Sequence, residues 1–456
     1  MIRNIPELIK GSAPTQHARR IVLHLLNEAL NAVNPRTLTE HALRFDNSMI
    51  TFGNQQLHLD EINGVFVIGA GKATGRMAEA IETLLNDHII GGLIIVPETT
   101  VNDYSLDLIQ IRGGGHPVPT EASITATQQL IDMVTHTPPD TLILSLFSGG
   151  GSALLTLPSP PITLEELQQT TELLLRSGMP IAEINTIRKH LSQVKGGQLF
   201  RHIHPRHHWG LLLSDVPDDQ LDMIASGPTL PDSTTFSDVA TLFDTYQLWN
   251  QVPGSVQDHL TTGVQGRAAD TPKPNDPLFI QSFHQLIGTN HDACQAALAH
   301  AQHQGFKTRI LTTNCQGEAR EVGAQLGRLA QQLTLQEQAQ IVIIGSETTV
   351  TIQQEGKGGR NTELVAAALP YMHGTKGLVL ASLATDGLDG PTDAAGAIAD
   401  GESHQRAHVL NLSPTLHLES NTTYHLFHNL GDLLITGPTH TNVRDITLIL
   451  WMGTGQ

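Results

Sequence analysis

One pattern recurs along the chain and limits its fold more than any other feature. A short run of β-branched or leucine residues is followed by glycines and then by a segment with helical periodicity. This alternation is typical of βα units, in which the strands lie parallel. The runs are almost continuously apolar, as expected of strands buried on both faces. We therefore predict an α/β fold with a mainly parallel sheet.

Nine segments fit the strand pattern. They are Val65 to Gly69, Gly92 to Val96, Thr141 to Phe147, Gly210 to Ser214, Thr308 to Thr312, Gln340 to Gly345, Gly377 to Leu383, Asp432 to Thr436 and Ile446 to Trp451. An opening helix is expected from Thr15 to Val33. No repeat of fixed period is visible, which argues against solenoids and propellers.

The length of 456 residues is enough for two or three domains with separate cores. Between residues 261 and 277, Gly, Pro and polar residues gather without apolar periodicity, which indicates an interdomain linker. We expect an N-terminal domain over residues 1–260 and a C-terminal domain over residues 278–456.

The charge balance narrows the class of ligand. With 26 Lys and Arg against 44 Asp and Glu, the formal net charge is −18, which disfavours a nucleic-acid binder. A content of 39% hydrophobic residues excludes a disordered chain. Because an acidic surface repels phosphates, any anion site has to be built locally.

Two further features indicate a cytoplasmic protein that does not contact membranes. The only cysteines are Cys294 and Cys315, too few for a disulfide framework. The N-terminus lacks the apolar core of a signal peptide, and no segment approaches the roughly 18 uninterrupted apolar residues of a membrane span.

The histidines resemble metal ligands at first sight, since the chain has 24 of them. The densest group, His202, His204, His207 and His208, lies in a polar stretch, and no HExxH or Cys/His zinc spacing occurs. We therefore expect a solvated histidine-rich loop there.

The first glycine-rich motif, VFVIGAGKATG, spans Val65 to Gly75. Gly69 and Gly71 permit a tight turn and close backbone approach, and Lys72 adds a charge beside the N-terminus of the next helix. The motif is neither a Walker A loop nor a complete dinucleotide fingerprint. It indicates a phosphate or carboxylate site, with a structural strand-to-helix turn as the alternative.

The second motif, LSLFSGGGSALL, places Ser148, Gly149, Gly150 and Gly151 directly after a strand. Three consecutive glycines are costly in entropy, so we interpret them as a backbone nest for phosphoryl oxygens. A close-packing turn is the alternative. In GGGHPVP, His116 either faces a substrate or belongs to a rigid loop.

Basic residues concentrate in INTIRKHLSQVKGGQL, which contains Arg188, Lys189 and Lys195. The whole chain has eight lysines, and three of them, Lys72, Lys195 and Lys357, adjoin a glycine in a glycine-rich stretch. This bias favours anion contact over a role in solubility.

Carboxylates and amides follow several strands. Asp215 comes after the fourth strand candidate, as a base, as a partner of a substrate hydroxyl, or as a helix N-cap. Glu347 lies just beyond another strand end, and Arg360 begins a helix in GKGGRNTEL. An arginine there suits a bidentate clamp on a carboxylate or phosphate.

The segment LATDGLDGPTDAAG holds Asp386, Asp389 and Asp393. Carboxylates that follow a strand suit Mg²⁺, with Asx turns in a surface loop as the alternative. The late motif TGPTHTNVRD offers Asn442 and Arg444, which alone would be weak support for a site.

Ten motifs in this order resemble the glycerate 2-kinase family, whose C-terminal part is the MOFRL domain and some of whose members carry the older label hydroxypyruvate reductase. They are IGAGKA, GGGHPVP, FSGGGSALL, INTIRKHLSQVKGGQL, SDVPDD, IASGPT, GSETTV, GKGGRN, ATDGLDGPTDAAG and TGPTHTNVRD. The similarity extends from about Thr15 to Gly453.

The resemblance implies an N-terminal Rossmann-like α/β/α sandwich and a smaller C-terminal MOFRL-type α/β domain. It also implies phosphorylation of D-glycerate by ATP with Mg²⁺, in most bacterial members at the 2-hydroxyl. Carried over by motif, the conserved site residues are Lys72, Asp215, Glu347, Arg360, Asp386 and Asn442.

We expect the amides of Ser148 to Gly151 and Lys72, aided by Gly69, Gly71 and Lys195, to bind ATP. Arg360 or a neighbouring basic residue then holds the glycerate carboxylate. Asp386 either holds the metal, together with Asp389, or accepts the hydroxyl proton. Both partners are small molecules, and the oligomeric state stays open, with a homodimer among the options.

Two other functions are alternatives to a kinase. An NAD(P)H-dependent hydroxypyruvate reductase is suggested by the near-fingerprint from Gly69 to Gly75, but the glycine spacing is imperfect. A non-catalytic sensor of a sugar phosphate or nucleotide would bind its ligand without turnover.

Overall fold

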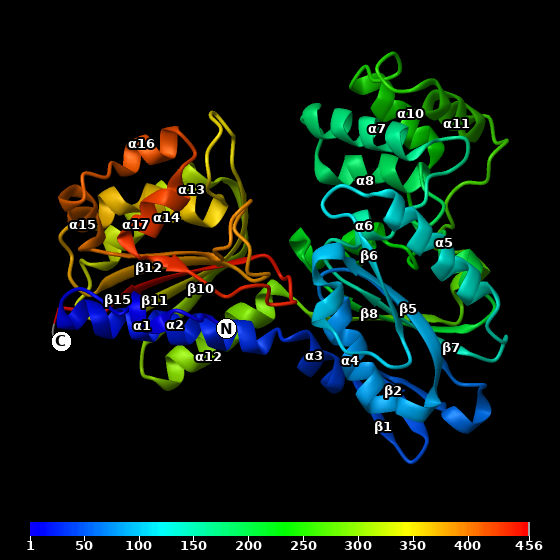
Figure 1. The fold of residues 1–456 in the computed structure, drawn as a ribbon, viewed down its shortest axis with the longest axis horizontal. Helices are drawn as coiled ribbons and strands as arrows, with labels where there is room; N and C mark the ends of the chain where they lie inside the picture. The colour runs from blue at the N-terminus through cyan, green and yellow to red at the C-terminus, as the bar shows by residue number, and fades with distance from the viewer. Residues whose placement is uncertain (455–456) are drawn as a thin grey trace. The chain divides into compact units, whose positions relative to one another are not determined.

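The computed structural model describes residues 1–454, and its internal packing divides the chain into two units. The central unit contains residues 35–288. The other, the terminal unit, contains residues 1–34 together with the chain from residue 289 onward. In Figure 1 the first helices, drawn in blue, accordingly belong with the yellow to red part of the chain.

The division differs from the expected one, because the segment 261–277 packs inside the central unit. The Thr271 hydroxyl donates to the buried Asp232 carboxylate at 3.0 Å, and the Asp232 backbone N–H donates to the Pro272 carbonyl at 2.8 Å. Polar contacts of this kind can hold a segment in place without apolar periodicity. The chain passes between the units at Asn34/Pro35 and at Gly288/Thr289 instead.

The central unit is built on a sheet of six strands that all run parallel. The strands are β4 (Val65–Ala70), β5 (Ile89–Pro97), β6 (Gln110–Gly114), β7 (Leu142–Phe147), β8 (His207–Leu213) and β9 (Ser282–Gly288). Their order is β6-β5-β4-β7-β8-β9. Every residue of β4 and β7 is buried, as the apolar runs predicted.

This order is that of a doubly wound sheet, in which the chain adds strands first on one side of β4 and then on the other. The order reverses between β4 and β7, and the loops that follow these two strands leave the same edge. In open α/β sheets this switch point is where ligands bind. The parallel α/β expectation for this part of the chain is confirmed.

The remaining elements of the central unit cover the sheet or extend from it. The helices beside the sheet are α3 (Pro35–Ala42), α4 (Thr74–Leu85), α5 (Glu121–Thr135), α6 (Gly151–Leu154) and α9 (Phe200–Ile203). A helical layer with its own apolar core consists of α7 (Leu164–Arg176), α8 (Ile181–His190), α10 (Phe236–Thr245) and α11 (Gly254–Val264). A small antiparallel sheet, absent from the sequence expectations, is formed by β1 (Leu43–Asp46), β2 (Met49–Phe52) and β3 (Gln55–His58).

The terminal unit also has a six-stranded sheet, in the order β10-β11-β15-β12-β13-β14. The strands are β10 (Lys307–Glu318), β11 (Gln340–Thr349), β12 (Leu378–Ala384), β13 (Gly396–Asp400), β14 (Leu433–Leu434) and β15 (Asp445–Trp451). The helices are α1 (Ile5–Leu8), α2 (Ala13–Ala32), α12 (Asn290–His303), α13 (Ala319–Leu333), α14 (Arg360–Met372), α15 (Ser403–Val409), α16 (Pro414–Glu419) and α17 (Thr423–Leu430). The long helices α2 and α12 lie on one face of the sheet, and α13 and α14 lie on the other (Figure 1).

This second sheet is mixed, which the local pattern did not indicate. Only β10 and β11 pair parallel, whereas the last strand, β15, inserts antiparallel between β11 and β12. As a result β11 and β12 run in the same direction, and their carboxyl ends flank the start of β15.

A buried ion cluster explains why the first residues belong to the terminal unit. Arg19 on α2 is fully buried and donates to Asp400 at 2.6 Å and to Asp432 at 2.8 Å. Burial opposes ionisation of Asp400, but the charges of Arg19 and Arg406 together with hydrogen bonds from Arg406 and the Glu402 N–H outweigh it and lower the pKa of that carboxyl. The contribution of ionised Asp400 to the free energy of unfolding is therefore complete above the ordinary pKa of Asp, and it is lost as pH falls through the lower folded-state pKa.

The expectation of a solvated histidine loop is wrong for His208. His207 begins β8, and the fully buried His208 ring contacts the Ser145 hydroxyl at 2.8 Å and the Ser282 hydroxyl at 2.9 Å. Burial, with His284 adding to it, holds the pKa of His208 well below its usual value. His208 is therefore a neutral part of the core.

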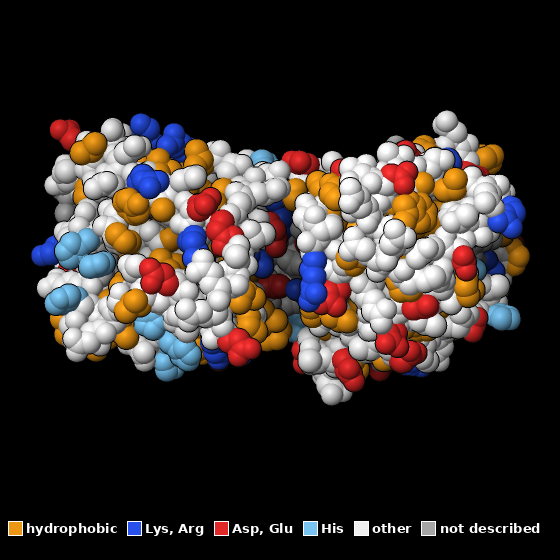
Figure 2. Space-filling view, turned by 90° about the horizontal axis from the view of Figure 1, so that it is seen from above, with side chains coloured by type: hydrophobic (Ala, Val, Ile, Leu, Met, Phe, Trp, Pro, Cys, Tyr) orange, Lys and Arg blue, Asp and Glu red, His pale blue; other side chains and the backbone are white. Residues whose placement is uncertain are grey.

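Within residues 1–454, none of the helices combines the length and the apolar character that crossing a membrane would require. On the face that Figure 2 draws, acidic side chains are scattered over both units rather than gathered in one patch.

Replacement of Arg19 by Met should lower the free energy of unfolding by about 3 kcal/mol, because Asp400 and Asp432 lose their fully buried cation and keep, within residues 1–454, only the partly exposed Arg406, with Lys10 at Asp432. Urea unfolding at neutral pH measures the change. The matched control is Arg309→Met, at an exposed arginine of the same unit, which should change stability by no more than about 0.5 kcal/mol. Equal stability of the two variants would contradict the role of the cluster.

Candidate functional site

The loops after β4 and β7 are hydrogen-bonded to each other at the switch point. The Lys72 backbone N–H donates to the Gly149 carbonyl at 2.9 Å. The Ala73 N–H donates to the buried Ser148 hydroxyl at 3.0 Å, and the Ser148 N–H donates to the Ala70 carbonyl at 3.3 Å. These contacts hold the two glycine-rich motifs in one fixed arrangement.

Glycine is required at two positions of this arrangement. Gly71 has a φ of +148°, and a Cβ there would lie 2.8 Å from the Ser148 carbonyl oxygen. Gly150 has a φ of +83°, and a Cβ there would lie 2.9 Å from the His116 ring and 3.4 Å from Cγ of Lys72. The structure therefore brings Lys72, His116 and the Ser148 loop together.

Two of the four amides expected to bind ATP are used within the protein, because the Ser148 N–H donates to the Ala70 carbonyl and the Gly151 N–H donates to the Ser148 carbonyl at 3.1 Å. Neither the Gly149 N–H nor the Gly150 N–H has a hydrogen-bond partner among residues 1–454. Two successive unpaired N–H groups next to a lysine form the kind of concavity that binds an anion. Gly69, by contrast, serves packing, because a Cβ there would run into the Leu146 carbonyl on the neighbouring strand.

Asp215 follows β8, the neighbour of β7, and is partly buried. Because β7 and β8 are parallel, Asp215 lies on the same edge of the sheet as the Ser148 loop. This is the position that the sequence predicted for a substrate-facing carboxylate.

Lys195 is placed differently from the expectation of an anion-binding lysine. Its buried Nζ donates to the Ser152 carbonyl at 2.7 Å and to the Leu155 carbonyl at 2.8 Å, at the end of the short helix α6. Burial, with the positive charge of Arg188 next in size, holds the pKa of Lys195 well below its usual value. Lys195 therefore stabilises the short helix that follows the glycine loop.

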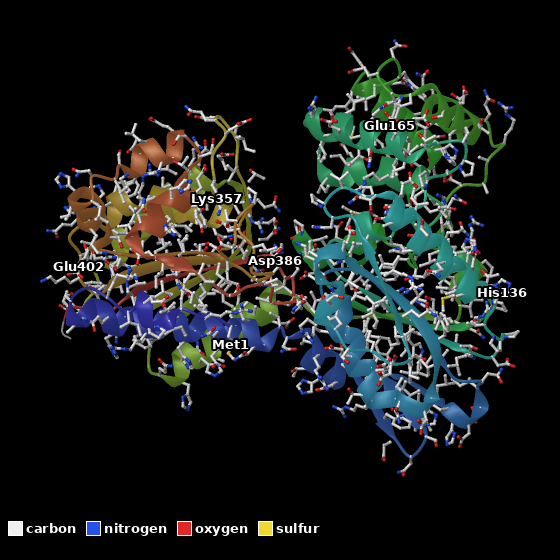
Figure 3. All side chains as sticks on the ribbon, in the orientation of Figure 1. Met1, His136, Glu165, Lys357, Asp386 and Glu402 are labelled. Atoms are coloured by element: carbon white, nitrogen blue, oxygen red, sulfur yellow. The ribbon has the colours of Figure 1, made fainter. Side chains whose placement is uncertain are left out.

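The terminal unit brings a second set of predicted residues to one sheet edge. Glu347 lies near the end of β11, Arg360 begins α14, and Asp386 lies in the loop after β12, where Figure 3 labels it. Asp386 is partly buried, and its Oδ1 accepts the Leu388 N–H at 3.0 Å. Asn442 precedes β15, and its Oδ1 accepts the Arg444 N–H at 3.3 Å.

Arg360 is already engaged by protein carboxylates. Its Nε and Nη2 donate to the two oxygens of the buried Asp445 at 2.5 and 2.7 Å, and Glu347 lies 3.4 Å away. Burial alone would lower the pKa of Arg360, but Asp445 outweighs it and raises that pKa. The expected clamp on a ligand carboxylate is thus occupied by Asp445, which the sequence reasoning did not single out.

Asp389 is built into the fold as well. One of its oxygens accepts the Asn361 N–H and the other the Thr362 N–H, both at 2.8 Å, at the N-terminus of α14. The side chain is fully buried, which raises the pKa of Asp389 although these amides oppose the rise. The geometry assigns Asp389 to helix capping, so its prediction as a metal ligand is not supported.

A pocket of about 260 Å³ opens beside Arg360 on the terminal unit. Its lining combines glycines with apolar side chains and comprises Thr348, Val350, Ile352, Gly356, Gly358, Gly359, Arg360, Glu363, Gly390, Pro391 and Asn421. Lys357, between the lining residues Gly356 and Gly358 in sequence, lies over the Tyr424 ring, 3.9 Å from the ring centre, and 3.8 Å from Asp393. Among residues 1–454, no cluster of three or more His, Cys, Asp or Glu side chains suits a metal by itself.

The chain matches two family models. The first is described as a domain of unknown function, DUF4147, and matches residues 21–261; the second is the MOFRL family and matches residues 340–445.

Named relatives cover nearly the whole chain. Glycerate 2-kinase of Pyrococcus horikoshii is 38% identical over 95% of this chain and 97% of its own length. A putative hydroxypyruvate reductase of Agrobacterium vitis is also 38% identical, over 84% of this chain and 86% of its own length. The crystal structure of glycerate kinase from Thermotoga maritima superposes with a TM-score of 0.80 at 34% identity, covering 95% of this chain and 99% of that one.

Replacement of Gly71 by Ala should destabilise the central unit by about 1–3 kcal/mol more than Gly178→Ala, since overpacking adds to the backbone strain. Gly178 also has a positive φ, +74°, but a Cβ there would meet nothing within 4 Å. Chemical unfolding of both variants separates strain from steric clash. Equal losses would show that the two loops can move apart at no cost.

Proposed function

The chain belongs to the glycerate kinase family, and on this premise we propose that it transfers the terminal phosphoryl group of ATP to the 2-hydroxyl of D-glycerate, yielding 2-phosphoglycerate and ADP. The observation that carries the proposal is the pair of unpaired amides of Gly149 and Gly150 beside Lys72 at the switch point. Phosphoryl transfer depends mainly on positioning and charge neutralisation, and this arrangement suits both.

Each residue then has a role in the transfer. The amides of Gly149 and Gly150 bind phosphate oxygens, and Lys72 neutralises part of the phosphate charge. Asp215, at the same edge of the sheet, orients the acceptor hydroxyl or takes its proton. Arg360 holds Asp445 and Glu347 in place rather than the substrate.

The family resemblance also implies Mg²⁺, and the donor set of the terminal unit fits one carboxylate ligand. Mg²⁺ usually takes one or two protein carboxylates and completes its shell with phosphate oxygens and water, so a larger cluster is unnecessary. Asp386 is partly buried and suits this role, whereas Asp389 is enclosed and hydrogen-bonded. A bound Mg²⁺ would neutralise charge on the phosphates during transfer.

The reductase alternative is disfavoured by the helix after β4. A dinucleotide fingerprint needs a third glycine there for close helix–strand packing. Thr74 occupies that position, is fully buried, and donates its hydroxyl to the Leu146 carbonyl at 3.2 Å. Because a relative from Agrobacterium vitis is named a putative hydroxypyruvate reductase, the experiment that tests the kinase activity also tests for reductase activity.

The decisive experiment incubates the purified protein with ATP, Mg²⁺ and D-glycerate and follows ADP release with a coupled assay. Phosphorus NMR of the product should show 2-phosphoglycerate. Formation of 3-phosphoglycerate alone would overturn the position of transfer, and NADH oxidation by hydroxypyruvate without ATP would overturn the kinase assignment.

Two aspartate variants separate the metal ligand from the helix cap. Asp386→Asn should raise the Mg²⁺ concentration needed for half-maximal activity by roughly tenfold or more, with an unchanged unfolding midpoint. Asp389→Asn should lower the free energy of unfolding by about 1–2 kcal/mol, because Asn presents one acceptor oxygen to two amides, and should leave the Mg²⁺ dependence unchanged. Titration of activity with Mg²⁺ and thermal unfolding are measured on both. The reverse pattern would return Asp389 to the metal.

A further inference from the structure

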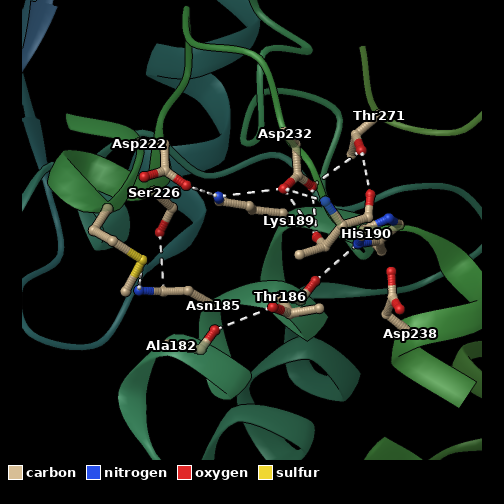
Figure 4. A network of polar contacts seen from close by, with 12 residues as sticks. Ala182, Asn185, Thr186, Lys189, His190, Asp222, Ser226, Asp232, Asp238 and Thr271 are labelled. Carbon is tan, nitrogen blue, oxygen red and sulfur yellow. Dashed lines mark hydrogen bonds and ion pairs between the residues drawn. The ribbon is translucent and has the colours of Figure 1, made fainter. Parts of the chain in front are cut away.

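Three consecutive basic residues, Arg188, Lys189 and His190, end helix α8. Lys189 lies 2.8 Å from Asp222 and 3.4 Å from Asp232, and His190 lies 2.9 Å from Asp270. Figure 4 shows the two contacts of Lys189. Arg188 makes no hydrogen bond or ion pair with any of residues 1–454. The fold thus supplies carboxylates to two of the three and none to Arg188.

The surroundings of Arg188 add positive charge instead of removing it. Arg188 is partly buried, which lowers its pKa, and its positive charge acts on the buried Lys195 nearby. Lys195 itself has only carbonyl acceptors within residues 1–454. Two neighbouring cations away from bulk water are unfavourable without an anion. A bound anion would supply what the protein leaves out.

A hydrogen-bonded pair of polar side chains connects this part of α8 to the glycine loop. Asn185 lies one turn before Arg188 on α8, so both are on the same face of the helix. The Ser226 hydroxyl donates to Asn185 Oδ1 at 3.3 Å and also contacts the Ser152 hydroxyl next to the glycine loop. Figure 4 shows Asn185 and Ser226 on the side of Lys189 that faces away from Asp232.

The backbone that presents Ser226 is held in a strained conformation. Ala225 and Ser226 have φ values of +51° and +61°, at the end of the 3₁₀ helix from Leu221 to Ser226. Residues other than glycine keep such angles only where the surroundings enforce them, and such sites are often functional. The strain therefore agrees with a role for this hydroxyl beyond packing.

We propose that Arg188 is the residue that binds the carboxylate of the acid substrate. The nearby Lys195 adds positive charge, and Ser226 and Asn185 supply neighbouring polar groups. A guanidinium fork matches a carboxylate with two parallel hydrogen bonds. Arg360, the other candidate, already forms such a fork with Asp445. The candidate phosphate site, formed by Gly149, Gly150 and Lys72, is separate from Arg188. The single positive charge of one guanidinium matches the single negative charge of a carboxylate. This inference rests on the proposed function.

The test measures equilibrium binding of D-glycerate and of ATP, each by calorimetry, to the wild-type protein and to Arg188→Gln. The variant should weaken D-glycerate binding by about 10- to 100-fold, the effect of losing hydrogen bonds to a charged group, and should change ATP binding by less than about twofold. Uncharged D-glyceramide should bind the two proteins equally. Circular dichroism and thermal unfolding verify the fold.

Two further variants complete the design. Arg176→Gln removes an exposed charge from α7 in the same unit, where Arg176 is 77% exposed and pairs with Glu172, and should bind D-glycerate like the wild type. Arg188→Lys keeps the charge but loses the fork, so it should fall between wild type and Arg188→Gln, and it replaces the latter if that variant does not fold.

The outcomes distinguish the inference from the proposed function. Unchanged D-glycerate binding in the Arg188 variants would overturn the inference, and so would a loss confined to ATP, which would assign Arg188 to phosphate. A wild-type protein that binds D-glycerate through Arg188 but transfers no phosphoryl group would keep the inference and overturn the kinase assignment.

Discussion

The candidate phosphate site depends on how closely the ends of β4 and β7 approach each other. Two backbone hydrogen bonds and the Ser148 hydroxyl join the loops, and there is no room for a Cβ at Gly71. None of these contacts uses the N–H groups of Gly149 and Gly150, so these two amides stay available to a ligand. The site is therefore set by the backbone of a rigid sheet rather than by mobile side chains.

Charged residues in this protein divide into those that complete the fold and those left for a ligand. Arg19, Lys189 and Arg360 each have a buried carboxylate within reach. Asp389 uses its charge on the first amides of α14. Arg188 lacks such a partner among residues 1–454, so its charge is not neutralised by a carboxylate of the protein. Charge type and sequence position alone do not separate the two classes.

Local patterns predicted the features that local physics controls. The apolar runs located β4, β5, β7 and β8 of the central sheet but not its edge strands β6 and β9, and the glycine motifs marked the two loops that need close approach. Properties that depend on distant partners were missed. The antiparallel insertion of β15, the burial of His208 against Ser145 and Ser282, and the pairing of Arg360 with Asp445 join residues far apart in the chain. No periodicity in a single segment contains that information.

The assembly of the terminal unit from both ends of the chain has a consequence for synthesis. Residues 35–288 leave the ribosome as an uninterrupted stretch, so the central unit can fold while the chain is still growing. Helix α2 precedes this stretch in the sequence, yet the carboxylate of Asp432 that pairs with Arg19 comes 413 residues later. The side chains of Leu23, Leu25 and Leu26 on α2, which are buried in the finished protein, therefore lack their final partners until the residues after Gly288 have been made. Helix α2 is thus synthesised before the central unit but reaches its final environment after it.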